Sequence, residues 1–457
     1  MEAMTQGDSV SRLEPVRQPL RGAVRVPGDK SVSHRAVMFG SVCDGEVVID
    51  NFAPGADNRS TVEVFRALGA QVTLSEDARR VTVVGRGRGG LASPDAPLDC
   101  GNSGTTMRLT AGLLTGLGLE ATLIGDASLS KRPMGRIVDP LRALGGELRA
   151  DGERGRPPVV IEGGEAFQGG AAELAIASAQ VKSALLLASL MSGRPLALTE
   201  PSPSRDHTEV MLRYLGAPVR SSAHYAQPEL EGRPEVTLEA WRGTLTARPV
   251  TVPGDISSAA FLMVAAAIVP GSEVVLEACG MSPTRVGVIE ALKGAAVRLV
   301  ERDPRNLPGG EPVADLVVSA GPLRGFEVLP VDVPRLIDEV PILAVLAGRA
   351  DGTTVFRGVE ELKVKESDRL AKTAELLRAC GREVEVGEDV LTVHGDPEAP
   401  YTAFRYDADH DHRMAAAAIV ASLVADGPCE VSGLDSLDVS YPGLVADLES
   451  LQGREES

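Results

Sequence analysis

The segment PGDKSVSHR, residues 27–35, is the most informative part of this chain, because a reduced copy, PGDISS, recurs at residues 253–258. Each copy leads into an apolar run that is typical of a buried helix, AVMF after the first and AAFLMVAAAIV after the second. The first copy places Lys30 and Arg35 beside a helix N-terminus, where free backbone N–H groups attract anions. The second copy has neither cation. The pattern indicates a duplicated scaffold in which one half carries a charge cluster.

The rest of the chain repeats this theme. Apolar helix patterns with a polar first turn recur roughly every 70–80 residues, and each is followed by Gly or Asp-Gly, which is a helix stop signal. Between them lie short runs such as residues 81–84 and 159–161, which predict strands. The period predicts six copies of a small α/β unit. The six buried helices are predicted to begin near Ser31, Ser103, Ser178, Ser257, Glu339 and Asp411.

Six units divide naturally into two domains of three, with boundaries at the two Pro-Gly-Asp points. We expect residues 28–252 to form the first domain, and residues 13–27 with 253–450 to form the second. The chain would then cross between the domains twice. An N-terminal strand over residues 13–16 would belong to the second domain.

Composition limits the classes of function. The chain has 457 residues, of which 43% are hydrophobic but only 3% aromatic, so platforms that stack nucleic-acid bases are disfavoured. The net charge of −18 disfavours binding to nucleic acid or to an anionic membrane. An anionic small molecule would need cations gathered locally.

Other features bear on location. The five cysteines are widely spaced and odd in number, which is typical of reduced thiols in the cytoplasm. We find no signal peptide and no apolar run long enough to span a membrane. The polar segments 1–12 and 451–457 are expected to be disordered.

Further helix starts carry residues that suit anions. The run GNSGTTMR at 101–108 is rich in Gly and hydroxyl groups, so a ligand could approach its backbone N–H groups closely. Lys131 and Arg132 precede a Pro at another helix start, and SAQ at 178–180 and SRDHTE at 204–209 open two more. Each could equally be a capped helix with solvated side chains, so the residues alone leave both interpretations open.

Two segments supply candidate acid–base groups. Asp338 and Glu339 border a strongly apolar helix, where partial burial would raise a carboxyl pKa toward general acid–base use. The segment KVKESDR at 363–369 is dense in charge, and in a helix Lys365 and Arg369 would share one face. A helix cap in the first case and a solvated charge run in the second are the alternatives.

Two motifs predict no cofactor. The run DADHDHR at 407–413 resembles a metal cluster, but Arg413 would repel a cation and no further His or Cys pair has ligand spacing, so we expect no metal. The run GRGRGG at 85–90 fits the dinucleotide pattern GxGxxG, but a loop follows it where a helix would be needed.

Taken together, these motifs resemble the enolpyruvyl transferases, and within them the 5-enolpyruvylshikimate-3-phosphate synthase family, over residues 13–443 and in the family's order. The resemblance implies an α/β (α+β) fold of two similar domains, each of three βαβαββ units around buried parallel helices, which close on substrate. It implies transfer of the enolpyruvyl group of phosphoenolpyruvate to the 5-hydroxyl of shikimate 3-phosphate, with release of phosphate and no cofactor. The expected partners are these two small molecules, bound by a cytoplasmic monomer.

The resemblance also implies roles for individual residues. Lys30 would touch both substrates, Asp338 would take the 5-hydroxyl proton, and Lys365 would bridge Asp338 to substrate. Glu366 would protonate the methylene carbon of phosphoenolpyruvate. The shikimate part would be bound by Ser31, Arg35, Ser178, Ala179, Gln180 and Arg205. Phosphoenolpyruvate would be bound by Asn102, Gly104, Thr105, Arg132, Arg369 and Arg413, with His412 nearby.

Such chemistry suits these residue types. Adding an alcohol to an enol ether requires one proton delivered to carbon and another removed from oxygen, which two carboxyl groups in opposite protonation states can do. Arginine forks hold carboxylate and phosphate groups bidentately.

The chain departs from the family pattern at several positions. The segment DVSYP at 438–442 lacks the Lys that many members carry there, so one phosphoenolpyruvate contact is expected to be missing or replaced. Segments 28–30, 178–180 and 205–209 resemble the subgroup that tolerates the herbicide glyphosate. However, Gly104 stands where tolerant members often have Ala, and Ser282 where they tend to have Asn. We therefore expect intermediate sensitivity to glyphosate.

Two alternatives remain. The sister enzyme of cell-wall synthesis transfers enolpyruvyl to a UDP-sugar and usually has a reactive Cys in the loop matched here by residues 126–131, which contain none. The other alternative is a non-catalytic anion-binding protein on this scaffold, against which the joint presence of Asp338, Lys365 and Glu366 argues.

Overall fold

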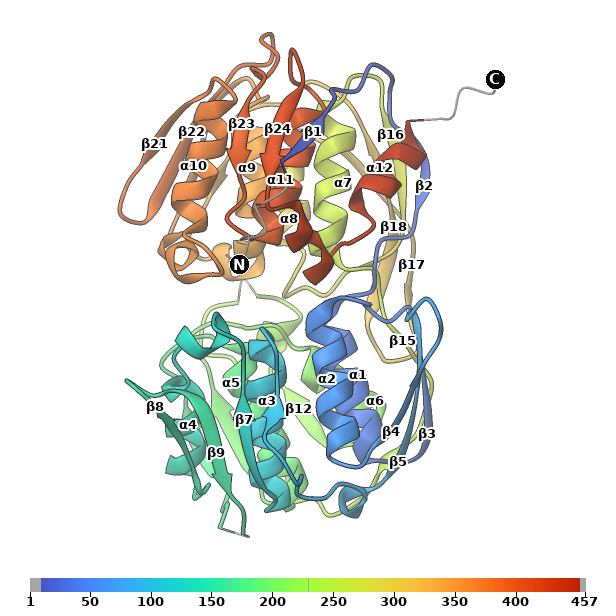
Figure 1. The fold of residues 1–457 in the computed structure, drawn as a ribbon, viewed down its shortest axis with the longest axis vertical. Coiled ribbons are helices and arrows are strands. Elements are labelled where there is room, and N and C mark those ends of the chain that lie inside the picture. The colour runs from blue at the N-terminus through green and yellow to red at the C-terminus, as the bar shows by residue number, and fades with distance from the viewer. Residues whose placement is uncertain (1–9, 165, 229, 453–457) are drawn as a thin grey trace, which may run out of the picture.

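The computed structural model describes residues 10–164, 166–228 and 230–452, and it has two lobes, one above the other (Figure 1). The N-terminal lobe is blue to green in the figure, and the C-terminal lobe is yellow to red apart from the blue N-terminal segment, which also lies in it. Six buried helices begin within one residue of the predicted starts, which confirms those predictions. They are α1 (Lys30–Val42), α3 (Gly104–Leu117), α5 (Ala179–Ser192), α7 (Ile256–Ile268), α9 (Val340–Ala347) and α11 (His412–Ser422).

Local sequence explains where these helices start and stop. In five of them the residue before the helix caps it, because its side-chain oxygen accepts a backbone N–H of the first turn. Gly118 and Gly193 end α3 and α5 in the left-handed conformation, with φ of 69° and 70°. The five capping residues are Asp29, Ser103, Ser178, Asp255 and Asp411.

In the described residues six sheets accompany the helices, and five of them share one pattern of strand order, while in the sixth the single strand β1 takes the place of the hairpin. An outer strand pairs in parallel with a central strand, which pairs antiparallel with the second strand of a hairpin. Three of the sheets belong to the N-terminal lobe and three to the C-terminal lobe.

In the N-terminal lobe, the first sheet runs β14 (Leu245–Thr246), β3 (Cys43–Asp50), β5 (Arg80–Arg86) and β4 (Gln71–Leu74), with β15 (Val250–Thr251) also on β3. The second sheet runs β6 (Leu98–Asp99), β7 (Glu120–Ile124), β9 (Arg156–Glu162) and β8 (Leu148–Gly152). The third runs β10 (Gly170–Glu173), β11 (Leu196–Thr199), β13 (Glu235–Leu238) and β12 (Val219–Ser221).

The C-terminal lobe repeats the arrangement. Its first sheet runs β2 (Arg21–Val24), β16 (Glu273–Gly280), β18 (Pro312–Ser319) and β17 (Arg298–Asn306). The second runs β19 (Glu327–Val328), β20 (Gly352–Arg357), β22 (Val390–Gly395) and β21 (Glu383–Val386). The third has three strands, β23 (Arg405–Asp407), β24 (Cys429–Ser432) and β1 (Ser11–Leu13). The repeated order confirms the prediction of a six-fold internal repeat.

A second set of helices is amphipathic, and each lobe carries three of them. They are α2 (Ala56–Ala67), α4 (Gly135–Ala143), α6 (His207–Tyr214), α8 (Gly287–Gly294), α10 (Arg369–Ala379) and α12 (Leu444–Leu451). Short 3-10 turns complete the chain: η1 (Arg88–Gly90), η2 (Leu129–Lys131), η3 (Ala223–Tyr225), η4 (Val333–Arg335), η5 (Ile337–Glu339), η6 (Glu360–Val364) and η7 (Leu434–Val439).

Each lobe has its own hydrophobic core. One core draws on residues 32–252, and the other on residues 20–26 together with 256–451. The chain passes between the lobes at the two Pro-Gly-Asp segments, which hydrogen-bond to each other: the Asp29 N–H donates to the Pro253 carbonyl (2.8 Å), and the Asp255 N–H to the Pro27 carbonyl (2.9 Å). Together these two segments form a junction of two short backbone strands.

A glycine is required at this junction. A β-carbon on Gly28 would lie 1.8 Å from the Asn51 carbonyl oxygen, which is far inside van der Waals contact, so no other residue fits without moving the backbone.

The ends of the described chain correct two predictions. The strand predicted over residues 13–16 is misplaced along the sequence. The observed strand β1 covers Ser11–Leu13, and the next strand, β2, begins only at Arg21. Residues 11 and 12 are not disordered, because β1 pairs antiparallel with β24 and adds an edge strand whose polar side chains can face solvent.

At the other end, Leu451 closes α12 and is 2% exposed, so the predicted C-terminal tail begins too early. The remaining tail predictions, for residues 1–9 and 453–457, lie outside the described residues. Among the described residues, no helix is long and apolar enough to cross a membrane.

Candidate active site

The candidate site lies between the lobes, where helix starts from both come together (Figure 1). The first residues of α1 and α7 are adjacent, since the Lys30 N–H lies 3.4 Å from Asp255 Oδ2. A side-chain bridge also joins the lobes here: Arg205 Nη2, just before α6, donates to Asp338 Oδ2 in η5 at 2.5 Å. This bridge brings together two residues predicted for the site from different halves of the chain.

On the N-terminal side, the starts of α3 and α5 are tied together by predicted residues. The Gln180 side-chain amide donates to Thr105 Oγ1 (3.0 Å), and its oxygen accepts from Arg108 Nη1 (2.8 Å). Gly104 leaves room for that arginine, because a β-carbon at this position would lie 2.6 Å from Arg108 Nη1. Ser178 and Ala179 form the cap and first residue of α5, half-buried beside Gln180.

The loop before α4 supplies another predicted pair. Arg132 Nη2 donates to the Asn102 side-chain oxygen (2.6 Å), while the Asn102 amide donates to Asp126 Oδ2 (2.8 Å). Asn102 therefore orients Arg132, and Arg132 comes within 3.6 Å of the space a β-carbon on Gly104 would fill.

The start of α1 divides its residues between the site and the lobe interior. Lys30 Nζ pairs with Asp57 Oδ2 of α2 at 3.1 Å, and its side chain is 26% exposed. Arg35 is instead buried, and it donates to Thr208 Oγ1 (2.6 Å), to Ser183 Oγ (2.9 Å) and to the carbonyl of Ser31 (2.9 Å). The structure thus places Lys30 in the site and Arg35 behind it, where it holds Ser31.

On the C-terminal side, Asp338 is surrounded by cations. Besides Arg205, its carboxylate lies 3.7 Å from Lys365 Nζ and 3.5 Å from Arg369 Nη1. Arg413 Nη2 lies 3.8 Å away, and Arg413 Nη1 donates to the backbone carbonyl of Asp338 (3.0 Å).

The electrostatics of Asp338 correct an expectation. Burial raises its pKa, but the charges of Arg413, Lys365, Arg205 and Arg369 outweigh burial and hold the pKa well below the usual value for Asp. The prediction that partial burial would raise this pKa is wrong, because the sequence showed the apolar helix but not how many cations converge.

Glu366 and Arg369 form a second charged group. Arg369 Nη2 pairs with Glu366 Oε2 at 2.6 Å, and the same guanidinium binds Asp411 through Nε (2.8 Å) and Nη2 (3.1 Å). Burial favours protonated Glu366, but Arg369, with Lys30 and Arg132 of the other lobe, holds its pKa below the ordinary value. Both predicted acid–base carboxyls are therefore ionised here, and not in opposite protonation states.

His412 opens α11 beside these groups. Burial, followed by the charges of Arg413 and Lys30, lowers the pKa of His412, so the imidazole is neutral near pH 7. A neutral ring can accept or donate one hydrogen bond without adding to the positive charge.

Several functional residues were missed by sequence reasoning. Arg108 holds Gln180, Asp57 holds Lys30, and Asp411 both caps α11 and binds Arg369. A signal for Arg108 was available, since it stands four residues after Gly104 and so on the same helix face. Asp411 was predicted as a helix start, but its contact with Arg369 and that of Asp57 with Lys30 carry no local signal, because these partners are distant in sequence.

The arrangement suits anionic ligands. Six cations contributed by both lobes surround Asp338 and Glu366, although the chain as a whole carries a charge of −18. No group of three or more His, Cys, Asp or Glu that could hold a metal is found in residues 10–452, leaving aside 165 and 229. The six are Lys30, Arg132, Arg205, Lys365, Arg369 and Arg413.

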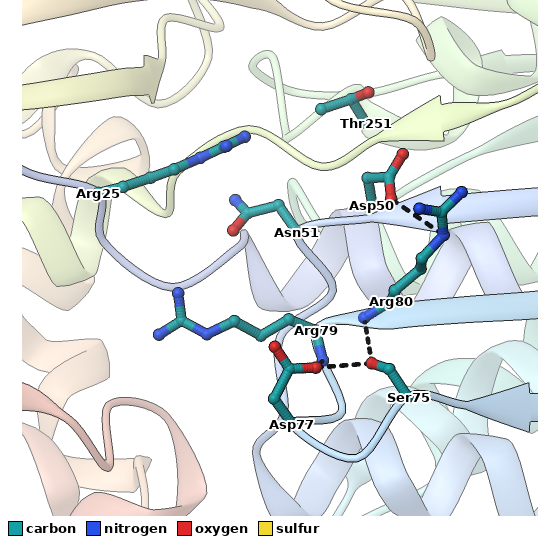
Figure 2. A pocket seen from close by; sticks show the side chains of 8 residues that line it. All are labelled: Arg25, Asp50, Asn51, Ser75, Asp77, Arg79, Arg80 and Thr251. Atoms are coloured by element: carbon teal, nitrogen blue, oxygen red, sulfur yellow. Dashed lines mark hydrogen bonds and ion pairs between the residues drawn. The ribbon is translucent and has the colours of Figure 1, made fainter.

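A large polar cavity lies elsewhere, with a volume of about 630 Å³. Figure 2 shows its lining, which includes Arg25 and Thr251 near the lobe junction and Arg79 and Arg80 from the β4–β5 hairpin. Asp50 pairs with Arg80 at 3.5 Å, and Asp77 accepts from Ser75 at 2.6 Å. None of these residues was predicted for the site.

The whole chain is similar to proteins of one family. The family model described as EPSP synthase (3-phosphoshikimate 1-carboxyvinyltransferase) matches residues 16–448. A protein of Alkalilimnicola ehrlichii named 3-phosphoshikimate 1-carboxyvinyltransferase is 46% identical over 93% of this chain and 92% of its own length. One of Oceanobacillus iheyensis with the same name is 42% identical over 96% and 98%.

Solved structures agree. The EPSP synthase of Acinetobacter baumannii superposes with a TM-score of 0.86, at 40% identity, over 96% of this chain and 97% of that one. The enolpyruvyl transferase NikO of Streptomyces tendae, with a TM-score of 0.72 over 97% and 98% of the two chains, is only 20% identical and supports the fold alone. The predicted fold class is therefore confirmed.

Proposed function

The chain belongs to the EPSP synthase family, a family of transferases, and we propose how its own residues carry out the reaction: transfer of the enolpyruvyl group of phosphoenolpyruvate to the 5-hydroxyl of shikimate 3-phosphate, with release of phosphate. The reaction belongs to the shikimate pathway to chorismate and the aromatic amino acids. The observation that carries the proposal is the Asp338 carboxylate, held among four cations from both lobes.

We assign the proton transfers to Asp338 and Glu366. In the addition step, Asp338 takes the 5-hydroxyl proton while Glu366 protonates the methylene carbon. In the elimination step the roles reverse: the Glu366 carboxylate takes a proton back from the new methyl group, the C–O bond to phosphate breaks as the double bond re-forms, and Asp338 gives up its proton as phosphate leaves. Asp338 is ionised, as a base that takes the 5-hydroxyl proton must be. Glu366 must be protonated to give a proton to the methylene carbon. The anionic groups of phosphoenolpyruvate would draw on Arg369, Lys30 and Arg132, the same cations that keep the pKa of Glu366 low, so binding would raise that pKa.

Phosphoenolpyruvate is assigned to the cations around Glu366. Arg132, which Asn102 orients, would pair with the phosphate of phosphoenolpyruvate. The backbone N–H of Gly104, at the start of α3, would donate a hydrogen bond to phosphoenolpyruvate. Arg369 and Arg413 would hold its carboxylate, with His412 beside them. Lys30 would contact both substrates, since it opens α1 at the candidate site and its side chain is 26% exposed. The lysine missing from residues 438–442 has no replacement that we assign.

Shikimate 3-phosphate is assigned to the starts of α1 and α5. The hydroxyl and N–H groups of Ser178 and Ala179 would cradle the 3-phosphate with Arg205, and Gln180 would lie on the ring. Ser31 would contact the shikimate part directly, while Arg35 would act through the Ser31 carbonyl that it binds. Lys365 would link Asp338 to the substrate hydroxyl.

Release of phosphate from phosphoenolpyruvate, measured with and without shikimate 3-phosphate, tests the proposal. We expect release only when both are present, and a loss of about 10²–10⁴-fold in Asp338→Asn, because a general base is worth that much. The control is Asp332→Asn, since Asp332 is in the same segment, six residues before the site. Release with a UDP-sugar acceptor instead, or with neither acceptor, would contradict the assignment.

We propose further that glyphosate inhibits the enzyme and that Gly104 sets how strongly. An alanine methyl would lie 2.6 Å from Arg108 Nη1, so the Arg108 guanidinium must shift, whereas its distance of 3.6 Å from Arg132 Nη1 is ordinary van der Waals contact. We expect Gly104→Ala to raise the inhibition constant of glyphosate more than the KM for phosphoenolpyruvate. An unchanged inhibition constant would refute this role for Gly104.

We also propose that the chain works as a cytoplasmic monomer without a cofactor. The five cysteines, Cys43, Cys100, Cys279, Cys380 and Cys429, are free and buried, as suits a reducing compartment. Sedimentation velocity at the enzyme's working concentration checks the monomer, and a mass near 95 kDa, about twice the chain's 47.7 kDa, would contradict it.

A further inference from the structure

A buried group of charges in the N-terminal lobe takes no part in the mechanism above. Lys182, in α5, is fully buried, and its Nζ lies 3.0 Å from Glu200 Oε2 and 2.8 Å from Glu209 Oε1. The ring of Tyr225 covers the ammonium, with its centroid 4.1 Å from Nζ, and the Tyr225 hydroxyl donates to Glu200 Oε2. We name these four residues the Lys182 cluster.

Stability alone does not explain the Lys182 cluster. Removing charges from water is so unfavourable that a buried ion pair often adds nothing over an apolar replacement of the same size. The surrounding core of this lobe is built from Leu, Val and Ala, which could have filled the space. The role of the Lys182 cluster must therefore lie in the contacts that it makes to the backbone.

Two contacts of the cluster meet at Ser204. Lys182 Nζ donates to the Ser204 carbonyl at 3.3 Å, and Ser204 Oγ donates to Glu200 Oε1 at 2.6 Å. Glu200 and Ser204 bracket a loop that contains two prolines, Pro201 and Pro203, so the loop is closed at both ends by one carboxylate. The cluster thus fixes both the side chain and the carbonyl of the residue before Arg205.

The residue after Arg205 is fixed from the other lobe. Asp206 Oδ1 accepts from Ser282 Oγ at 3.2 Å and from Thr284 Oγ1 at 3.1 Å, both in the C-terminal lobe. Arg205 therefore leaves a backbone segment that is held on each side, and its guanidinium reaches Asp338 at 2.5 Å. Without such anchors a long arginine on a loop would lose side-chain and backbone entropy on binding a ligand.

We propose that Lys182, Glu200 and Tyr225 are positioning residues that act through Ser204 to place the Arg205 guanidinium for the phosphate of shikimate 3-phosphate. This inference rests on the proposed function, in which Arg205 contacts that phosphate. It predicts that the cluster sets the affinity for shikimate 3-phosphate and leaves the affinity for phosphoenolpyruvate alone, because Arg132 and Arg369 belong to other segments.

Two small changes test the proposal. Ser204→Ala removes the hydrogen bond to Glu200, and Tyr225→Phe removes the hydroxyl but keeps the ring over Lys182. We expect each to raise the KM for shikimate 3-phosphate about tenfold while the KM for phosphoenolpyruvate changes less than twofold. The matched control is Tyr401→Phe, since Tyr401 is also buried, also lies against a cation (Arg382, 4.7 Å) and also donates to a partner, but in the other lobe.

A double-mutant cycle separates positioning from general damage. In an Arg205→Ala background, Ser204→Ala and Tyr225→Phe should have no further effect on the KM for shikimate 3-phosphate, because the group they position is gone. Effects of equal size with and without Arg205 would overturn the proposal, as would an equal rise in both KM values. Urea unfolding of each variant shows whether it folds, and if Tyr225→Phe unfolds, Ser204→Ala at the edge of the cluster decides.

Failure of the proposed function would look different. If the unsubstituted enzyme released no phosphate with shikimate 3-phosphate, the function would be wrong and this inference would fall with it. If the unsubstituted enzyme were active but Ser204→Ala kept both KM values, only the inference would be overturned.

Discussion

The two Pro-Gly-Asp segments have similar backbones and differ in the residue that follows the aspartate. In the first, Lys30 faces the space between the lobes and pairs with Asp57. In the second, the matching residue is Ile256, which is 2% exposed and belongs to the core. The aspartates cap their helices alike, yet one copy supplies a charge for substrate and the other does not.

The two copies share a polar partner, Arg285. This buried guanidinium lies 3.2 Å from Asp29 Oδ2, 3.5 Å from Asp255 Oδ1 and 3.9 Å from Glu339 Oε1, and it donates to Ser257 Oγ at 2.7 Å. One cation therefore joins the caps of both copies. We infer that duplication preserved the junction while the two copies acquired different roles. The first copy supplies a charge for substrate, and the second stabilises the contact between the lobes.

Removing Arg285 is the strongest way to break the junction. Arg285→Met leaves Asp29, Asp255 and Glu339 buried without their shared cation, so we expect the free energy of unfolding to fall by about 3–5 kcal/mol. Urea unfolding at pH 7 measures this. As a control, Arg357→Met breaks an exposed pair with Glu327 and should cost less than about 1 kcal/mol. Equal losses in the two variants would contradict the central place of Arg285.

Converting the first copy to the second comes next. Lys30→Ile should lower kcat/KM for phosphate release by about a hundredfold, because a cation that meets both substrates is lost. Unfolding free energy should change by less than about 0.5 kcal/mol, since the pair with Asp57 is partly exposed. Lys293→Ile, which breaks an exposed pair with Glu301, is the control for activity. Retained activity would mean that Lys30 is dispensable.

The pH dependence of stability isolates the contribution of Asp29, one of the carboxylates that share Arg285. Burial raises the pKa of Asp29, but His207 and Arg285 lower it to about 2, against 3.8 for an ordinary Asp. The contribution is therefore present above pH 4 and is lost as the pH falls toward 2, by about 2 kcal/mol. Asp29→Asn should lack this component in urea unfolding at pH 4.5 and pH 3, whereas the exposed Asp95→Asn should keep it. If the unfolding free energy of Asp29→Asn fell with pH as much as that of the unsubstituted protein, this role of Asp29 would be wrong.

The two matching serines should give the smallest and most instructive difference. Ser257→Ala removes a buried partner of Arg285 and Glu339, so about 1.5 kcal/mol of stability should be lost. Ser31→Ala should leave stability nearly unchanged, because Ser31 is half-buried, but raise the KM for shikimate 3-phosphate several-fold. Unfolding and kinetics on both variants check this, and a swapped pattern would mean that the assignment of tasks is reversed.

Much of the fold could be predicted because it depends on local patterns. The six buried helices are apolar nearly all round, and a polar residue precedes each of them, so each start was placed within one residue. The first strand was misplaced because β1 is a polar edge strand, whose partner β24 lies at the far end of the chain. Pairing of this kind leaves no mark in the sequence around Ser11.

The site was predictable in its residues more than in its geometry. Lys30, Asp338 and Arg369 stand in dense motifs, and the structure brings them together. The burial of Arg35 and the low pKa of Asp338 depend on groups more than 25 residues away, which no spacing rule reaches. The Lys182 cluster was missed for the same reason, since Lys182 and Tyr225 meet only in the folded lobe.

The pairing of β1 with β24 has a consequence for how the protein is made. The ribosome synthesises β24 about 400 residues after β1. Meanwhile residues 32–252 can complete their own core as soon as they emerge. β1 thus has no strand partner while the N-terminal lobe is being translated, because β24 is synthesised after that lobe. Because two of the three residues in Ser11–Leu13 are polar, the unpaired strand exposes little apolar surface. It therefore has little tendency to aggregate with other chains before β24 is made.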